Sequence, residues 1–231
     1  MTAAATVRER PILFSGPMVG AILDGRKSQT RRAISDATAQ GNYRASELLL
    51  NDARTFVDPG PSPAGNPGPY LHAFVNAPLV EKRRGWKSGD CDPEIMDRLY
   101  PRWFPGDRLW VRERFSRSKL VTTNDGKAAI WYWADGAPVD MANWGDTKPS
   151  IHMPRWASRL TLEVTEVRAE RVQDMMDTDG MREGWQCDPS NLDYLPRLWY
   201  RDLWNSLNAK RGYGWEANPW VWVLVFRRVE S

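Results

Sequence analysis

The sequence predicts an α+β fold: a small, mostly antiparallel β-barrel flanked by short helices, with a long irregular insertion. At least five segments have the pattern of strands and three or four have the pattern of helices, and the two kinds do not alternate regularly. That order argues against a doubly wound parallel sheet and favours a compact antiparallel one. We expect a single domain over 1–231, with its core at 11–33 and 105–229 and the insertion at 34–104.

The first part of the core combines a short strand, a helix and a basic turn. Residues 12–14 are apolar and predict a strand. Pro17 suits the first turn of a helix, Met18 and Ile22 give it an apolar face, and Gly25 ends it. The turn that we expect next carries these polar side chains: Arg26, Lys27, Thr30, Arg31 and Arg32.

The insertion at 34–104 shows no sustained pattern. Residues 58–70 are so rich in proline and glycine that no regular element is expected there. Short helices are predicted at 46–54 and 92–100. We therefore expect an irregular segment packed over the core rather than a second domain.

The second part of the core contains most of the strands. A turn and a strand are predicted at 105–115, and another strand at 128–134. The segment 158–172 alternates as a long strand, and its phase changes after Val164, which indicates a bend or bulge. Residues 219–229 are apolar enough for a terminal strand that is buried on both faces.

Two helices are predicted between the last two strands. Residues 174–185 form a short helix that ends at Gly184. Residues 194–208 form a firmer helix, because apolar side chains recur on one of its faces. That face comprises Leu195, Leu198, Trp199, Leu203 and Leu207.

Composition excludes several classes of function. The net charge is +3, from 32 basic and 29 acidic residues, which is too balanced for a protein that coats nucleic acid. Neither a membrane-spanning run nor a secretory signal is present, so we expect a cytoplasmic protein without a membrane partner. Two cysteines and two histidines are scattered without metal-binding spacing. They predict neither a metal site nor a cofactor, and they are Cys91, Cys187, His72 and His152.

The stretch "DGRKSQTRR" (24–32) resembles the signature of the ASCH family, whose fold is PUA-like. In the family pattern a glycine, a lysine, a polar residue and an arginine follow one another at fixed spacing. Here they are Gly25, Lys27, Thr30 and Arg32. The blocks "GDRLWVRE" (106–113) and "EGW" (183–185) agree in order, and three ordered blocks make a more specific signal than any one of them.

Threonine at position 30, where the family often has glutamate, resembles the branch that hydrolyses N4-acetylcytidine to cytidine and acetate. The resemblance implies a catalytic group of Lys27, Thr30 and Glu183. The chemistry is plausible from the residues themselves, because amide cleavage needs a nucleophile, a base and an acid. Thr30 would attack the acyl carbon. Lys27 would take its proton once burial and neighbouring cations lower the lysine pKa.

Glu183 is expected at the C-terminal end of a helix, where the helix dipole disfavours a carboxylate and raises its pKa. It would then donate a proton to the departing cytosine nitrogen. In the alternative assignment, Lys27 and Glu183 activate a water molecule, and Thr30 only positions the substrate. The sequence leaves both assignments open.

Further residues are candidates for binding a small-molecule substrate. Phe14 and Ser15 end the first strand, and Phe14 could stack on a pyrimidine or simply pack in the core. Trp185 could cover the site or the end of the helix. Arg32 and Glu113 are candidates too. Arg32 could instead have a structural role as the partner of a barrel carboxylate such as Glu113, because a buried charge in a strand needs a partner.

A second class of function is a module that binds RNA or DNA and recognises a base or a modified base. A third, less favoured one is a nuclease. The basic clusters at 26–32 and 81–87 could contact phosphate. The low net charge favours a small ligand over a polymer. The sequence does not indicate the oligomeric state.

Overall fold

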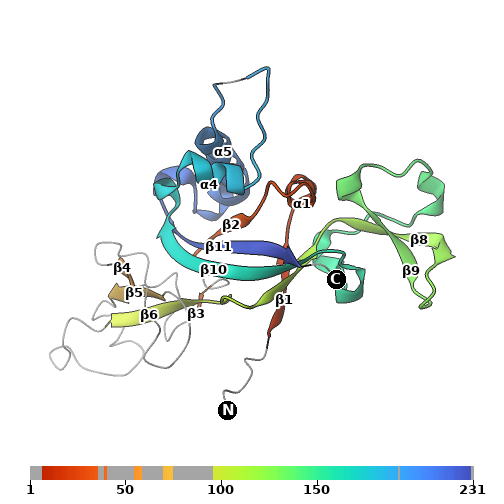
Figure 1. Ribbon diagram of the computed structural model, residues 1–231, viewed down its shortest axis with the longest axis horizontal. Helices are drawn as coiled ribbons and strands as arrows, with labels where there is room; N and C mark the ends of the chain where they lie inside the picture. Colours follow the sequence, from red (N-terminus) through yellow and green to blue (C-terminus); the bar gives the residue numbers. More distant parts are fainter. Residues whose placement is uncertain are drawn as a thin grey trace, which may run out of the picture.

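Figure 1 shows the computed structural model of the chain. It describes residues 7–35, 39–40, 55–58, 70–74, 96–191 and 193–229. Within these residues the fold is mixed α+β and consists mostly of strands, so the predicted α+β class is confirmed.

Five strands of the described chain form the central sheet, in the order β1–β7–β10–β11–β2. They are β1 (Glu9–Leu13), β7 (Arg108–Arg112), β10 (Thr161–Arg171), β11 (Trp220–Val229) and β2 (Gln29–Ala33). β1 and β7 are parallel, and the other neighbouring pairs are antiparallel. β10 and β11 curve together across Figure 1, and their register shifts between Val164 and Glu166. The predicted bulge is therefore confirmed.

The described part of the insertion contains a second sheet, so the expectation of an irregular segment is wrong there. Its strands, in spatial order, are β3 (Ala39–Gln40), β6 (Met96–Pro101), β5 (Tyr70–Phe74) and β4 (Thr55–Asp58). The helix predicted at 92–100 is wrong over 96–100, because pairing with β5 overrides the local pattern. The helix predicted at 46–54 and the proline-rich run 59–69 lie outside the described residues.

A two-stranded hairpin, β8 (Phe115–Thr122) and β9 (Ala128–Tyr132), extends away from the central sheet in Figure 1. The sequence predicted β9. It missed β8, because most of this strand is polar and exposed and so shows no apolar alternation.

The α-helices of the described chain are α1 (Gly16–Leu23), α4 (Asp177–Arg182) and α5 (Pro196–Asn208). All three were predicted at these places. In Figure 1, α4 and α5 lie together beside the end of β10 and β11. Short 3-10 turns lie at Trp133–Asp135, Met141–Asn143, Ser150–His152, Arg155–Ala157, Val172–Asp174, Ala209–Arg211 and Trp215–Ala217.

The predicted contact face of α5 is wrong in part: Trp199 and Leu203 pack against the core cluster as expected, but the three leucines at its ends do not. Leu195, Leu198 and Leu207 of that face are 50%, 39% and 52% exposed. The helix instead buries Tyr200 and Trp204, four residues apart, together with Pro196 and Asn208. Aromatic rings bury more apolar area than leucine, and the Trp204 indole N–H also donates to the Tyr213 carbonyl oxygen at 2.7 Å.

The central sheet buries side chains on both faces, and this arrangement positions the site. On one face, Val221 and Val223 of β11 pack with Tyr200 and Trp204 of α5. The other face holds a larger cluster: Ile12, Phe14, Leu162, Val164, Trp222, Leu224 and Phe226. Directly paired residues of antiparallel strands share a face. Arg31, opposite Val223, therefore lies on the α5 face.

Candidate active site

The end of α1 brings Lys27 to the end of α4. Gly25 has a φ of 75°, which suits a glycine at a helix end, and the Lys27 amide then donates to the Ala21 carbonyl at 2.9 Å. The Ser28 amide donates to the Arg182 carbonyl at 2.9 Å, and Lys27 and Glu183 form an isolated antiparallel bridge. Backbone contacts thus align two residues that are 156 positions apart.

The polar turn predicted after Gly25 is shorter than expected. Thr30, Arg31 and Arg32 belong to strand β2, which pairs with β11 from Gln29 to Ala33. A row of charged side chains can occupy this strand because carboxylates from β10 and α4 meet it.

Lys27 and Glu183 form a buried ion pair. Lys27 Nζ lies 2.7 Å from Glu183 Oε2 and 2.9 Å from the Glu183 carbonyl oxygen. The two side chains are 0% and 2% exposed. Burial lowers the pKa of Lys27, the Glu183 carboxylate opposes this, and the charges of Arg32 and Arg31 lower the pKa further. The low lysine pKa that the sequence analysis required is therefore supported by burial and by neighbouring cations.

The residue after Glu183 has to be a glycine, Gly184, because of its backbone conformation and its close neighbours. Its φ is 106°, and a Cβ atom there would lie 2.9 Å from Ala21 Cβ and 3.3 Å from Lys27 Cβ. A side chain would force α1 and α4 apart. The "EG" sequence thus permits the close approach that pairs Lys27 with Glu183.

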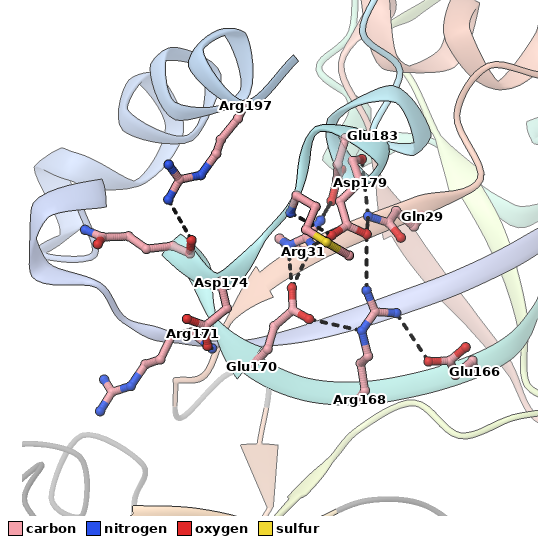
Figure 2. A network of polar contacts seen from close by, with 12 residues as sticks. Gln29, Arg31, Glu166, Arg168, Glu170, Arg171, Asp174, Asp179, Glu183 and Arg197 are labelled. Carbon is pink, nitrogen blue, oxygen red and sulfur yellow. Dashed lines mark hydrogen bonds and ion pairs between the residues drawn. The ribbon is translucent and has the colours of Figure 1, made fainter. Parts of the chain in front are cut away.

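Arg31 lies at the centre of an ionic network (Figure 2), and its side chain is 0% exposed. Its Nη2 atom lies 2.6 Å from Glu170 Oε1 and 3.2 Å from Asp179 Oδ2. Its Nη1 atom lies 3.2 Å from Glu183 Oε1. Burial acts to lower the pKa of Arg31, but Glu183 and the other nearby anions raise it overall.

A second arginine, Arg168, is partly exposed and lies at the outer side of this network. Arg168 Nε donates to Glu170 Oε2 at 3.0 Å, and its Nη1 atom donates to Glu166 Oε1 at 3.2 Å. Asp179 also accepts a hydrogen bond from Gln29 Nε2 at 3.1 Å. Figure 2 shows that these side chains extend from β10, β2 and α4 toward one another.

Thr30 and Glu183 line the same pocket, which has a volume of about 250 Å³. Thr30 pairs with Leu224, so it belongs to the face of β2 opposite to Arg31, and it is 3% exposed. The pocket lies between β2, α1, α4 and α5. The other lining residues are Met18, Arg31, Arg32, Ala33, Ser35, Tyr200, Leu203, Trp204, Leu207, Asn208 and Arg211.

Two of the expected binding residues do not pair as predicted. Glu113 is 1% exposed, and both its oxygens accept from Arg159, at 2.9 and 3.0 Å. Arg32 instead donates to the Leu13 carbonyl oxygen at 2.8 Å. The expected Arg32–Glu113 pair is wrong, because Arg159 of the neighbouring strand segment reaches Glu113. Arg32 lines the pocket, whereas Glu113 does not.

The aromatic candidates have mixed positions. Phe14 is 4% exposed and packs 6.2 Å from the Phe226 ring, and Lys27 Nζ lies 5.7 Å from its ring centre. Ser15 lines a second pocket of about 690 Å³, which shares Glu183 with the first. Trp185 is half-buried and lines neither pocket.

Sequence reasoning missed Glu170 and Asp179, which hold Arg31 together with Glu183, and it missed Arg168, which contacts Glu170 and Glu166. Glu166, Arg168 and Glu170 recur every second residue in β10, which indicates one face of a strand and was a usable signal. It also missed Tyr200 and Trp204 as walls of the pocket.

In the described residues, no cluster of three or more histidine, cysteine, aspartate or glutamate side chains could hold a metal ion. None of the described helices is long and apolar enough to cross a membrane. Comparisons with models of known protein families, with curated proteins and with solved structures found no match to this chain.

Proposed function

We propose that this protein is an amidohydrolase that removes the acyl group from N4-acylated cytosine or cytidine, as its resemblance to the ASCH family implies. The observation that carries the proposal is the 2.7 Å contact between Lys27 Nζ and Glu183 Oε2, at a pocket lined by Thr30. These are the three residues that the resemblance nominates.

The burial of this pair supports a functional role. Moving an ammonium and a carboxylate out of water costs several kcal/mol per ion, roughly, and their attraction does not reliably offset that cost. A lysine that follows a helix end is ordinarily a solvated charge, but Lys27 is 0% exposed. Perturbed, buried titratable groups beside a pocket are typical of catalytic sites.

The pair already holds the protons that the reaction needs. Transfer of one proton from Lys27 to Glu183, across their hydrogen bond, converts the ion pair into a neutral amine and a carboxylic acid. Burial disfavours the charged form of Lys27 and so lowers its pKa. The site can therefore present a base and an acid without an external proton.

In the proposed reaction, Thr30 Oγ1 attacks the acyl carbon and the Lys27 amine takes the hydroxyl proton. Lys27 Nζ faces Glu183 through two hydrogen bonds, so after the proton transfer the amine must turn its lone pair toward Thr30 before it can accept the hydroxyl proton. The C–N4 bond then breaks, and Glu183 protonates the leaving cytosine nitrogen. Water hydrolyses the acyl-threonine, which releases the acid and restores Thr30.

In the alternative mechanism, Lys27 and Glu183 activate a water molecule that attacks the acyl carbon directly. Thr30 then only donates a hydrogen bond to the substrate. Both mechanisms use the same pocket and the same proton donor and acceptor, Glu183 and Lys27. The experiments below separate them.

The pocket size supports a small substrate. Its volume of about 250 Å³ falls just below the roughly 300–1,000 Å³ of pockets for drug-sized ligands. A pyrimidine base or nucleoside suits this space better than a folded polymer. We therefore propose a small-molecule substrate and not a nucleic-acid partner.

A PUA-like barrel is part of the same proposal. β1 and β2 end the central sheet on opposite sides, yet Arg32 of β2 donates to the Leu13 carbonyl oxygen of β1 at 2.8 Å. This contact supports a sheet that curls toward closure, with the Lys27–Glu183 pair at its open end.

The test is to incubate the protein with N4-acetylcytidine and to follow its ultraviolet conversion to cytidine, with and without a chelator. We expect turnover that survives chelation. Activity lost with the chelator would contradict a metal-independent mechanism. No turnover with any N4-acyl cytosine, together with salt-sensitive RNA binding, would support the nucleic-acid module instead.

Thr30 variants separate the two mechanisms. Thr30→Val removes the hydroxyl with little change of shape. Thr165→Val is the control, because Thr165 lies exposed on β10 and its hydroxyl donates to the Val225 carbonyl oxygen, away from the pocket. A threonine nucleophile predicts that Thr30→Val is inactive and that an acyl group is trapped on Thr30 by rapid quenching. Residual turnover in Thr30→Val without a trapped acyl group would favour attack by water.

A further inference from the structure

We propose that Arg31 and Glu170 are positioning residues that hold Glu183 in register with Lys27. This inference rests on the proposed function, but it concerns two residues to which the ASCH resemblance gives no role. Arg31 lies between two positions of the family pattern, Thr30 and Arg32, and is not itself part of it.

The two oxygens of Glu183 have different partners. Oε2 accepts from Lys27 at 2.7 Å, and Oε1 accepts from Arg31 Nη1 at 3.2 Å. A carboxylate held at both oxygens cannot rotate without losing one partner. Arg31 thus fixes which oxygen faces Lys27.

Arg31 is in turn oriented from β10. Its Nε and Nη2 atoms both donate to Glu170 Oε1, at 3.0 and 2.6 Å. The other oxygen of Glu170 accepts from Arg168 Nε at 3.0 Å. Glu170, Arg31, Glu183 and Lys27 therefore form one continuous chain of contacts, which begins outside the pocket and ends at the proposed base. Figure 2 shows the part of this chain from Glu170 through Arg31 to Glu183.

The same chain influences the proton of Lys27. The groups that face Lys27 are Glu183 at the end of α4, Arg31 and Arg32 from β2, and the uncharged ring of Phe14. After burial itself, the two arginine charges lower the pKa of Lys27 while Glu183 raises it. Removing the Arg31 charge should therefore raise the pKa of Lys27.

The first test compares two glutamates that both accept from Arg168. Glu170 also contacts Arg31, whereas the side chain of Glu166 is 56% exposed and, among the described residues, pairs with Arg168. We expect Glu170→Gln to lower kcat on N4-acetylcytidine by at least about tenfold, as small misplacements of catalytic groups do, with little change in KM because Glu170 does not line the pocket. Glu166→Gln should behave as wild type.

The second test removes the charge of Arg31 without leaving an excess of carboxylates. The double variant Arg31→Gln/Glu170→Gln loses one cation and one anion, so it keeps the charge balance of the network. The part of its kcat/KM profile that rises with pH, as Lys27 loses its proton, should move to higher pH because the pKa of Lys27 is raised. A purely structural role would lower the melting temperature without moving this part of the profile.

Lysine NMR titration supplies a readout that is independent of activity. The Lys27 resonance, assigned by its loss in Lys27→Met, should titrate at higher pH in the double variant than in wild type. If the wild type hydrolyses no N4-acyl cytosine, the proposed function fails and this titration alone decides the inference. An unchanged Lys27 titration, or a Glu170→Gln protein as active as wild type, would overturn it.

Discussion

Replacing Lys27 by methionine removes one charge from the buried pair and leaves Glu183 without its nearest cation. Breaking a buried ion pair by removing one partner costs about 3–5 kcal/mol. Because Arg31 still contacts the other oxygen of Glu183 at 3.2 Å, we expect a loss near the lower limit, about 3 kcal/mol. For a chain of this size, 1 kcal/mol shifts the melting temperature by roughly 2–4 °C, so the expected drop is roughly 6–12 °C.

The assay is urea unfolding of a double-mutant cycle with Glu183→Gln. Once Glu183 carries no charge, Lys27→Met should cost much less, which gives a coupling energy of about 2 kcal/mol. The control is Lys148→Met, since Lys148 is exposed and its replacement should leave stability nearly unchanged. Single effects that add within about 0.5 kcal/mol would refute the reasoning, because they would mean that the two groups do not interact.

The pH dependence of this loss has a definite sign. Burial lowers the pKa of folded Lys27 below its ordinary value of 10.5. Between the folded pKa and 10.5, the unfolded chain binds more protons at this lysine than the folded protein does. Wild-type stability relative to Lys27→Met should therefore rise with pH across that window and level off above it.

Two further predictions test other parts of the account. Gly184→Ala should destabilise the protein by about 1–3 kcal/mol or more and impair turnover, because its Cβ would meet Ala21, whereas Gly126→Ala, with φ of 78° and open space, should cost about 1 kcal/mol and leave turnover unchanged. Glu113→Gln should lower the melting temperature, since Glu113 loses its charge-assisted bonds to Arg159, but KM should stay at the wild-type value. A raised KM in Glu113→Gln would contradict this and would indicate that Glu113 contacts the substrate.

Four of the five central strands were predictable because burial and alternation are local signals, whereas β2 was expected as a polar turn. The bulge after Val164 and the doubly buried β11 followed from the phase and composition of their segments. Strands β4, β5 and β6 were not predictable in this way, because their stability depends on pairing between distant short segments. The prediction for α5 was wrong in part for a related reason. The helix has apolar side chains on two faces, and packing against the central sheet decides that Tyr200 and Trp204 are the buried ones.

For the candidate site, the sequence predicted which residues take part but not the contacts between them. The ASCH resemblance nominated Lys27, Thr30 and Glu183. The helix that ends at Glu183 was expected, but Thr30 was expected in a turn and lies in strand β2. The contact of Arg31 with Glu170 depends on the registers of β2 and β10 against β11, which no local pattern specifies. Strand register likewise decides that Arg32 donates to the Leu13 carbonyl oxygen and does not pair with Glu113.

The most direct test of the central claim is the kcat/KM of Lys27→Met for N4-acetylcytidine, measured beside wild type at a temperature where circular dichroism shows both proteins folded. The account predicts measurable wild-type turnover and a loss of at least about a hundredfold in the variant, the size expected for removing a catalytic base. A folded Lys27→Met protein that hydrolyses the substrate as fast as wild type would contradict the claim.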